Sequence, residues 1–366
     1  MPKIILLPGD GIGPEVTEEA KSCLAFLSLR CDLDIEFEEH DFGGVAIDRH
    51  GTPLPDATLA ACRDADAILL GAVGGPKWDG AKERPEAGLL KLRSELGLFA
   101  NLRPGGSIAG LEVLSPLKSE IAAGTDILVV RELTGGAYFG DKSLDDDRAS
   151  DLCVYTRPEI ERIAHVAFAA ARRRSKRLTS VDKANVLSTS KLWRRIVIEV
   201  AADYPDVALD HMYVDAAAMA LVTNPRRFDV ILTENMFGDI LSDELAVIGG
   251  SIGLLGSASL GSGGPGLYEP IHGSAPDIAG LDIANPAGAI AAAGMLLESA
   301  LNLPDMARIM DEAIELTLRD GIRTADLGGS AGCSEFGARV REHLDARLGK
   351  RDALLELIAM NRGCCG

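Results

Sequence analysis

The sequence of 366 residues has few aromatic residues, no paired cysteine motif and no long hydrophobic run. Its seven cysteines are an odd number and none lies in a Cys-x-x-Cys pair, which excludes a disulfide framework and a typical zinc site. No apolar stretch approaches the roughly 18 residues of a membrane span, and Pro8 interrupts the N-terminal stretch too early for a secretory signal peptide. We therefore expect a cytoplasmic protein with reduced cysteines, in which Cys364 and Cys365 belong to an exposed C-terminal tail.

Acidic residues outnumber basic ones, and the formal net charge is -18 at pH 7. This charge repels nucleic acids and anionic membranes, so neither is expected as a partner, and an anionic ligand must meet a local group of arginines. The basic run RRRSKR at 172–177 leaves an RNA-binding protein as an alternative of another class. No aromatic residue interleaves this run to stack on bases, and its cations suit the C-terminal end of the preceding helical stretch.

Strand-like runs alternate with helix-like stretches along most of the chain. Runs typical of strands lie at 3–7, 66–71, 126–132, 178–186 and 228–234. The alternation predicts an α/β fold with a mainly parallel sheet. The C-terminal part is predicted to be helical, and residues 285–302 are apolar on nearly all sides, which indicates a buried helix.

One interval, residues 135–159, lacks any helical period. It reads as two strands joined by an acidic loop. We expect an arm of about 135–157 that serves as a clasp between subunits.

The glycine-rich stretch LLPGDGIGPE at 6–15 resembles a phosphate-binding loop. A dinucleotide fingerprint needs Gly-x-Gly-x-x-Gly, but the third glycine is replaced by Pro14 when counted from Gly9 and by Val16 when counted from Gly11. The stretch therefore predicts a tight turn, followed by a helix with Pro14 at its first position and Glu15 in its first turn.

Asp239 and Asp243 lie four residues apart in a predicted helix. At this spacing two carboxylates project from one helix face and can share a cation, although a solvated helix face is an alternative. Carboxylate oxygens are the ligands preferred by Mg²⁺ and Mn²⁺. The pair is therefore a candidate metal site.

Arg93, Arg103 and Arg131 stand in or beside apolar segments, where guanidinium groups suit the capture of carboxylates. Together with a carboxylate metal site they indicate a small polycarboxylic acid as the ligand. Lys183 and Tyr138 are candidates for proton transfer, because a divalent cation nearby lowers the pKa of a lysine.

The segment LYEPIHGSAPDIAG at 267–280 is rich in glycine and proline. Four consecutive residues, His272, Gly273, Ser274 and Ala275, could enclose an adenosine. Asp277 could accept hydrogen bonds from ribose hydroxyls, and its charge would favour NAD over NADP.

These motifs together resemble the metal-dependent β-decarboxylating dehydrogenases, which include isopropylmalate, isocitrate, homoisocitrate and tartrate dehydrogenases. The resemblance extends from GDGIGPE to about residue 330 and is most specific, for the isopropylmalate type, in GLLKLR, FANLRP, ELTGGAYFG, SVDKANVL, NMFGDILSDE and LYEPIHGSAPDIAGLDIANP. It implies a two-domain α/β fold with a mixed, mainly parallel sheet that is not a Rossmann fold. Residues 1–98 and 252–366 would form the first domain and residues 99–251 the second.

The resemblance also implies roles for individual residues. Arg93, Arg103 and Arg131 would bind the substrate carboxylates, and Asp239 and Asp243 would bind Mg²⁺ or Mn²⁺. Asp215, contacting metal and substrate, and Lys183 would come from the other subunit of a homodimer. Lys183 and Tyr138 would be catalytic, and the substrate's alkyl group would meet Glu86, Leu89, Leu90 and Val186. The NAD contacts would be Ile12, Glu269, His272, Gly273, Ser274, Ala275, Asp277, Asn285 and Asp326.

The activity implied by this resemblance is the NAD-dependent oxidative decarboxylation of 3-isopropylmalate to 2-oxo-4-methylpentanoate and CO₂, in leucine biosynthesis. A tartrate, D-malate or other 3-alkylmalate dehydrogenase of the same family is the nearest alternative. An apolar pocket discriminates by only about 1–3 kcal/mol per methylene, so related alkylmalates are expected to react as well.

Overall fold

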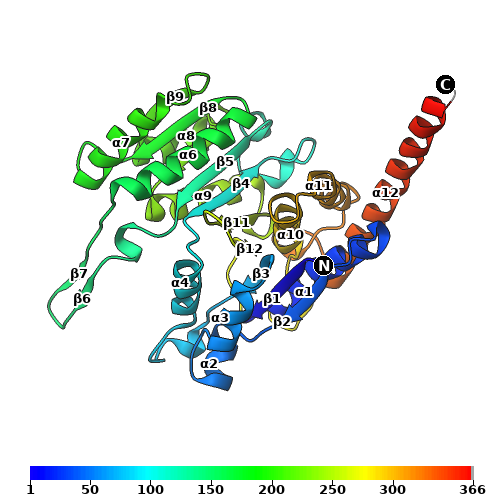
Figure 1. Ribbon diagram of the computed structural model, residues 1–366, viewed down its shortest axis with the longest axis horizontal. Coiled ribbons are helices and arrows are strands. Elements are labelled where there is room, and N and C mark those ends of the chain that lie inside the picture. Colours follow the sequence, from blue (N-terminus) through cyan, green and yellow to red (C-terminus); the bar gives the residue numbers. More distant parts are fainter. Residues whose placement is uncertain (364–366) are drawn as a thin grey trace.

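A computed structural model describes residues 1–363 of the chain, and the predicted tail with Cys364 and Cys365 lies outside these residues. Its main feature is a ten-stranded sheet (Figure 1). The strands follow the spatial order β2 (Glu36–Glu39), β1 (Lys3–Gly9), β3 (Ala67–Ala72), β12 (Gly266–Pro270), β11 (Gly256–Leu260), β4 (Ala100–Gly106), β5 (Asp126–Glu132), β10 (Val230–Thr233), β8 (Arg177–Asp182) and β9 (Ala208–Tyr213).

Six of the nine neighbouring strand pairs are parallel, and the three antiparallel pairs join β12, β11, β4 and β5 in the middle. The predicted mixed, mainly parallel α/β sheet is therefore confirmed. Every residue of β3 and of β10 is buried, as expected for strands covered by helices on both faces.

Helices cover both faces of the sheet. They are α1 (Gly13–Cys31), α2 (Gly44–His50), α3 (Asp56–Arg63), α4 (Pro85–Glu95), α5 (Ser119–Ala122), α6 (Arg157–Arg173), α7 (Ser188–Ala201), α8 (Val214–Thr223), α9 (Asn235–Gly249), α10 (Ala287–Ser299), α11 (Pro304–Arg319) and α12 (Cys333–Gly363). Short 3₁₀ turns include η3 (Gly136–Tyr138) and η5 (Ile252–Leu254). None of the helices in the described part of the chain combines the length and apolar character that a bilayer crossing needs.

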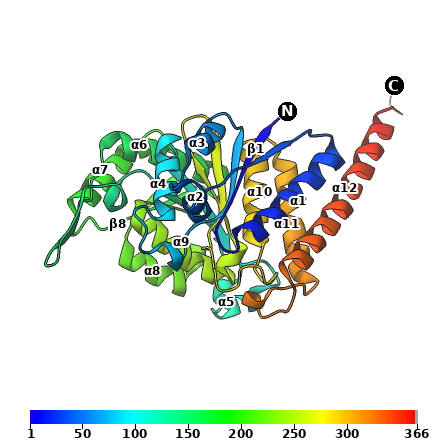
Figure 2. The same cartoon turned by 90° about the horizontal axis from the view of Figure 1, so that it is seen from below.

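Two large groups of apolar side chains lie at opposite ends of the sheet. One packs α1, α10, α11 and α12 against β1 and β3, and Figure 2 shows these helices together on one side. The other packs α6 and α7 against β5, β8 and β10. The apolar segment 285–302 forms α10 inside the first group, as expected for a buried helix. The division into domains 1–98 with 252–366 and 99–251 stays a prediction.

The predicted arm consists of two short antiparallel strands, β6 (Lys142–Leu144) and β7 (Ala149–Asp151). It projects away from the sheet in Figure 1. All six strand residues are exposed, and Leu144 retains 86% of its accessible surface. The role of this arm as a clasp between subunits stays a prediction.

The N-terminal glycine-rich turn has a structural role. The buried carboxylate of Asp10 accepts hydrogen bonds from the backbone N–H groups of Gly44, Val45 and Gly74 at 2.8–2.9 Å. Gly11 has a φ of +58°, and an added Cβ would lie 1.9 Å from the carbonyl oxygen of Ser274. The turn thus packs against the 267–280 segment. Helix α1 begins at Gly13, so Pro14 is its second residue and not the first as predicted, and Glu15 lies in the first turn as predicted.

The basic run at 172–177 spans the end of α6 and the start of β8. Within it, Arg172 and Lys176 pair with Asp206, and Arg174 pairs with Asp126 and Asp229. These partners compensate the charges that an RNA-binding face would present to phosphates.

Candidate active site

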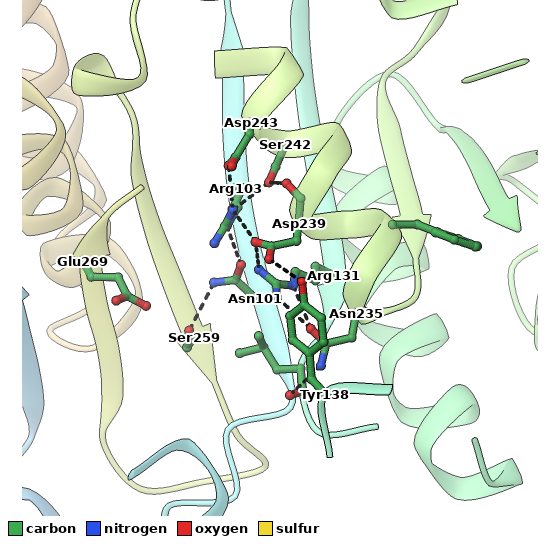
Figure 3. A network of polar contacts seen from close by, with 12 residues as sticks. Asn101, Arg103, Arg131, Tyr138, Asn235, Asp239, Ser242, Asp243, Ser259 and Glu269 are labelled. Carbon is green, nitrogen blue, oxygen red and sulfur yellow. Dashed lines mark hydrogen bonds and ion pairs between the residues drawn. The ribbon is translucent and has the colours of Figure 1, made fainter. Parts of the chain in front are cut away.

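Strands β4 and β5 and helix α9 bring the predicted metal and substrate residues together (Figure 3). Arg103 lies on β4, Arg131 lies on β5, and α9 packs across both strands. Close approach of α9 depends on Gly238, where an added Cβ would lie 2.6 Å from Cγ of Arg131. Five residues, Arg103, Arg131, Tyr138, Asp239 and Asp243, are called the α9 cluster below.

The guanidinium group of Arg103 is buried and held on two sides. Its Nε donates to Oδ1 of Asn101 at 2.7 Å, and its Nη1 donates to the hydroxyl of Ser242 at 2.7 Å. The same Nη1 lies 3.5 Å from Oδ1 of Asp239 and 3.3 Å from Oδ1 of Asp243. Burial lowers the pKa of Arg103, and the two aspartates oppose this effect.

Arg131 is the most deeply buried cation of the cluster, with 3% of its side chain exposed. Its Nε and Nη2 donate to Oδ1 of Asn235 at 3.0 and 2.8 Å, and its Nη1 pairs with Oδ1 of Asp239 at 2.5 Å. Burial, and secondly the charge of Arg103, lower the pKa of Arg131 to about 10. The group therefore remains a cation at neutral pH.

Tyr138 reaches the cluster from η3. Its hydroxyl donates to Oδ2 of Asp239 at 2.9 Å, and its ring lies under the guanidinium group of Arg131. Burial and the neighbouring Asp239 raise the pKa of Tyr138. The phenol therefore stays protonated and can serve as a proton donor.

The two carboxylates of α9 converge on one cationic position. Nη1 of Arg103 occupies that position in the single chain, within 3.5 Å of an oxygen from each aspartate. Burial raises the pKa of Asp243, and the charges of Arg103 and Arg131 oppose this shift. No set of three metal-binding side chains is found within the described residues.

Arg93 lies on α4 and pairs with Glu269 of β12, with 2.7 Å between Nη2 and Oε1. Both side chains are nearly buried, and Nε of Arg93 has no partner in the described part of the chain. The charge of Arg93 contributes to lowering the pKa of both Arg103 and Arg131, which places it within electrostatic reach of them. The structure thus brings the three predicted arginines together and puts Glu269, predicted to contact NAD, beside one of them.

Lys183 and Asp215 lie elsewhere. Lys183 directly follows β8, and Asp215 lies in the first turn of α8. They form an ion pair with each other and are called the lysine pair below. Their side chains are 27% and 60% exposed, and neither contacts the α9 cluster of the same chain.

The residues predicted to meet the alkyl group also lie in two places, some beside Arg93 and one beside Lys183. Glu86, Leu89 and Leu90 lie on α4 at the spacing that places them on the face of Arg93. Val186 is 63% exposed and follows Lys183 in the same turn.

The predicted NAD residues lie in two neighbouring places. The backbone N–H of Ile12 donates to the carbonyl of Ser274, whose hydroxyl donates to the carbonyl of Gly74. Asn285 donates to Oδ2 of Asp326 at 2.9 Å. Along the same segment, Gly273 and Asp277 are exposed and Ala275 adopts a left-handed φ of 37°.

Nδ1 of His272 lies 2.9 Å from the carbonyl oxygen of Gly273 and must donate to it. Burial lowers the pKa of His272, so the ring is neutral and its second nitrogen, Nε2, is a hydrogen-bond acceptor. That nitrogen is buried and has no partner among the described residues. It can therefore accept a hydrogen bond from a ligand.

Three supporting residues were missed by the sequence analysis. Asn101 and Ser242 hold Arg103, and Asn235 holds Arg131. Their spacing carried the signal, because Asn101 shares a strand face with Arg103, and Asn235, Asp239 and Ser242 share a helix face.

Comparison with known proteins shows which family this chain resembles. Residues 3–340 match the family model described as isocitrate/isopropylmalate dehydrogenase. A relative from Staphylococcus saprophyticus named 3-isopropylmalate dehydrogenase is 56% identical over 343 residues, which cover 93% of this chain and 99% of the relative. A relative of the same name from Listeria monocytogenes is 54% identical over 344 residues, or 94% and 98% of the two chains.

Two solved structures are also similar over nearly their whole length. The crystal structure of isocitrate dehydrogenase from Methylococcus capsulatus superposes with a TM-score of 0.85 at 37% identity, covering 94% of this chain and 99% of that one. A β-decarboxylating dehydrogenase from Thermococcus kodakarensis has a TM-score of 0.79 at 38% identity, covering 95% and 98%.

Proposed function

The chain belongs to the isocitrate/isopropylmalate dehydrogenase family, and we propose that it catalyses the NAD-dependent oxidative decarboxylation of 3-isopropylmalate in leucine biosynthesis. The products are 2-oxo-4-methylpentanoate, CO₂ and NADH. The observation that carries the proposal is the α9 cluster, two buried guanidinium groups facing two carboxylates, in a chain more than half identical to enzymes of that name.

The arginines bind the two carboxylates of the substrate. Arg103 and Arg131 are already fixed by Asn101, Ser242 and Asn235, so little side-chain entropy is lost when the substrate binds. The unpartnered Nε of Arg93 offers a further donor toward the same ligand.

Asp239 and Asp243 fit a divalent metal, because both oxygens already face one cationic position. Asp215 from a second subunit would complete the set, and oxygen-only ligands favour Mg²⁺ or Mn²⁺. A bound divalent metal would supply positive charge to stabilise the oxygen on C2 of the substrate, and bound NAD would supply the hydride acceptor.

Lys183 and Tyr138 move the protons. Lys183 would accept the proton of the C2 hydroxyl as the hydride leaves C2, which turns the alcohol into a ketone. The bond between C3 and its carboxylate then breaks. CO₂ departs, and the electron pair of that bond stays on the organic product. Tyr138, protonated beside Asp239, donates the proton that C3 receives.

The exposed lysine pair supports a homodimer with shared sites. Lys183 and Asp215 lie at the surface of their own chain, apart from the α9 cluster they are to serve. Helices α8 and α9 expose a row of apolar side chains, among them Met219 and Ile240 at 63% and 59%, which suits burial against the same face of a second copy.

NAD would bind along the 267–280 segment and the Asn285–Asp326 pair. The acceptor Nε2 of His272 suits the amino group of adenine, and the exposed Asp277 would repel the 2′-phosphate of NADP. The buried Cys23 and Cys62 are not in disulfides, in line with the cytoplasmic location that is also part of the proposal.

The apolar residues on α4 favour the branched alkylmalate over related acids. Leu89 and Leu90 precede Arg93 by one turn of helix, so they would lie beside the substrate's side chain. Tartrate and D-malate carry a hydroxyl group or a hydrogen at the position of the alkyl group, so they would gain no apolar contact with Leu89 and Leu90.

NADH formation from a panel of substrates tests the proposal. We expect turnover with 3-isopropylmalate, NAD and Mn²⁺, weaker turnover with other 3-alkylmalates, and little with isocitrate, D-malate or tartrate. NADP should replace NAD poorly. Efficient turnover of malate with poor turnover of isopropylmalate would assign the chain to another member of the family.

A further inference from the structure

Arg194 has no role in the site described so far, yet it contacts a residue close in sequence to each residue of the lysine pair. It lies on α7, and its guanidinium group binds the buried carboxylate of Asp182 with two hydrogen bonds, Nε to Oδ2 at 2.7 Å and Nη2 to Oδ1 at 2.8 Å. Asp182 is the last residue of β8 and directly precedes Lys183. The side chain of Asp182 is only 1% exposed, so this bond fixes the end of the strand from within.

Asp182 also shapes the turn that carries the lysine. Its Oδ1 accepts a hydrogen bond from the backbone N–H of Ala184 at 2.9 Å, and the N–H of Lys183 donates to the hydroxyl of Ser190 at 3.0 Å. Arg194 and Ser190 both belong to α7, so this helix sets the direction in which Lys183 leaves the strand.

The other face of Arg194 lies on Tyr213. The guanidinium carbon is 5.1 Å from the centre of the Tyr213 ring, and Nζ of Lys183 is 6.0 Å from the same centre. Tyr213 is the N-cap residue of α8, two positions before Asp215. A single guanidinium group thus contacts the residue preceding Lys183 and the residue that starts the helix of Asp215.

We propose that Arg194 is a positioning residue that holds Lys183 and Asp215 as one rigid unit for delivery to the active site of a second copy of this chain. The inference rests on the shared site proposed above. Two flexible surface side chains would otherwise each need to be ordered when the dimer site forms, whereas a unit fixed by Asp182, Arg194 and Tyr213 arrives in its working geometry.

The variant Arg194→Lys tests this role, because lysine keeps the charge beside Asp182 but cannot form the two-pronged bond or lie flat on Tyr213. We expect kcat to fall by about 10–100-fold, since a small misplacement of reacting groups has an effect of that size. The KM for NAD should stay unchanged, because the proposed NAD residues lie in other segments. Arg174→Lys is the matched control: Arg174 and Asp229 also form an ion pair, 25% and 2% exposed against 27% and 1% for Arg194 and Asp182, at the other end of β8.

Mixed dimers of differently tagged chains identify which half of the site Arg194 serves. A dimer of Arg194→Lys with Asp239→Asn contains one site with an intact α9 cluster and an intact lysine unit, so activity should recover. A dimer of Arg194→Lys with Lys183→Met contains no such site and should not recover. Full activity of Arg194→Lys, a loss equal to that of Arg174→Lys, or equal recovery in both mixtures would overturn the inference.

A third mixture separates this inference from the proposed function. A dimer of Lys183→Met with Asp239→Asn must recover activity if sites are shared between chains. Failure of that mixture would overturn the shared site itself. Its success, together with no recovery in the mixture of Arg194→Lys with Asp239→Asn, would overturn the role of Arg194 alone.

Discussion

The α9 cluster and the lysine pair are built on opposite principles. Arg103 and Arg131 are buried, with 9% and 3% of their side chains exposed, and each is held by uncharged side chains as well as by aspartates. Lys183 and Asp215 lie at the surface and neutralise each other. In the proposed enzyme, one chain thus fixes the groups that would bind the anionic substrate, whereas its Lys183 and Asp215 would act only in the site of a second copy.

The contrast supports the proposed homodimer, in which each site would draw residues from two chains. A cluster of buried arginines is stable alone because Asp239 and Asp243 compensate its charge. A lysine held in the same place would compete with those arginines for the same two carboxylates. In the proposed homodimer, the exposed position of Lys183 would delay that competition until the dimer and its ligands are assembled.

Removal of the divalent metal should have the largest effect on this arrangement. Without it, the α9 cluster and the lysine pair lose the cation that both are expected to bind, and turnover should fall to background. Dialysis against EDTA followed by an NADH assay measures this, and Mn²⁺ should restore activity. EDTA saturated with Mg²⁺ is the control, and full turnover by protein shown by elemental analysis to be metal-free would contradict the metal site.

Loss of the lysine alone should be the next largest effect. Lys183→Met should reduce kcat by about 10²–10⁴-fold, the usual contribution of general acid–base catalysis. Melting temperature and dimer content should hardly change, because the partner Asp215 is exposed and can be solvated. Lys176→Met, which removes another surface lysine paired with an aspartate, is the control. Retention of turnover in Lys183→Met would break the distinction between the two regions.

A change within the α9 cluster should affect binding more than turnover. Arg131→Lys keeps a cation but loses the fork that contacts Asn235 and Asp239. A charge-assisted hydrogen bond contributes about 1.5–3 kcal/mol, so we expect the KM for isopropylmalate to rise by about 10–100-fold. Arg227→Lys, an exposed arginine paired with Asp210, should leave the KM unchanged. An unaltered KM in Arg131→Lys would remove this arginine from substrate binding.

Much of this architecture could be predicted from sequence because its signals are local. The alternation of strands and helices, the four-residue spacing of Asp239 and Asp243, and the strand character around Arg131 each lie within a few residues. The run from Asp126 to Glu132 was predicted as a strand and is β5. The motif resemblance then supplied the family, which the comparisons confirmed.

The remainder could not be predicted because it depends on contacts between distant segments. Asn235 binds Arg131 across 104 positions, and Arg93 meets Glu269 across 176. Glu269 had been assigned only to NAD, since nothing near it in sequence indicates an arginine partner. Arg194 carries no local sequence signal of a role, and only the fold shows its contacts with Asp182 and Tyr213.

The smallest expected effect concerns the pH dependence of stability beneath the α9 cluster. Glu132 ends β5 next to Arg131, and its side chain is fully buried. Burial raises its pKa above the usual 4.5, although hydrogen bonds from Thr134 and Gly135 oppose the shift. A glutamate with a raised folded pKa stabilises the protein fully below the unfolded pKa, and that contribution is lost as the pH rises through the folded pKa.

Glu132→Gln should therefore flatten the dependence of unfolding free energy on pH above the unfolded pKa of glutamate, by about 1.4 kcal/mol for each unit of pKa shift. Urea unfolding at one protein concentration across this range measures the slope, and the slope is informative even if glutamine lowers stability at every pH. Glu161→Gln, at an exposed glutamate paired with Arg157, should leave the slope unchanged. Equal slopes in the wild type and Glu132→Gln would show that the buried Glu132, next to Arg131, contributes no pH dependence to the unfolding free energy.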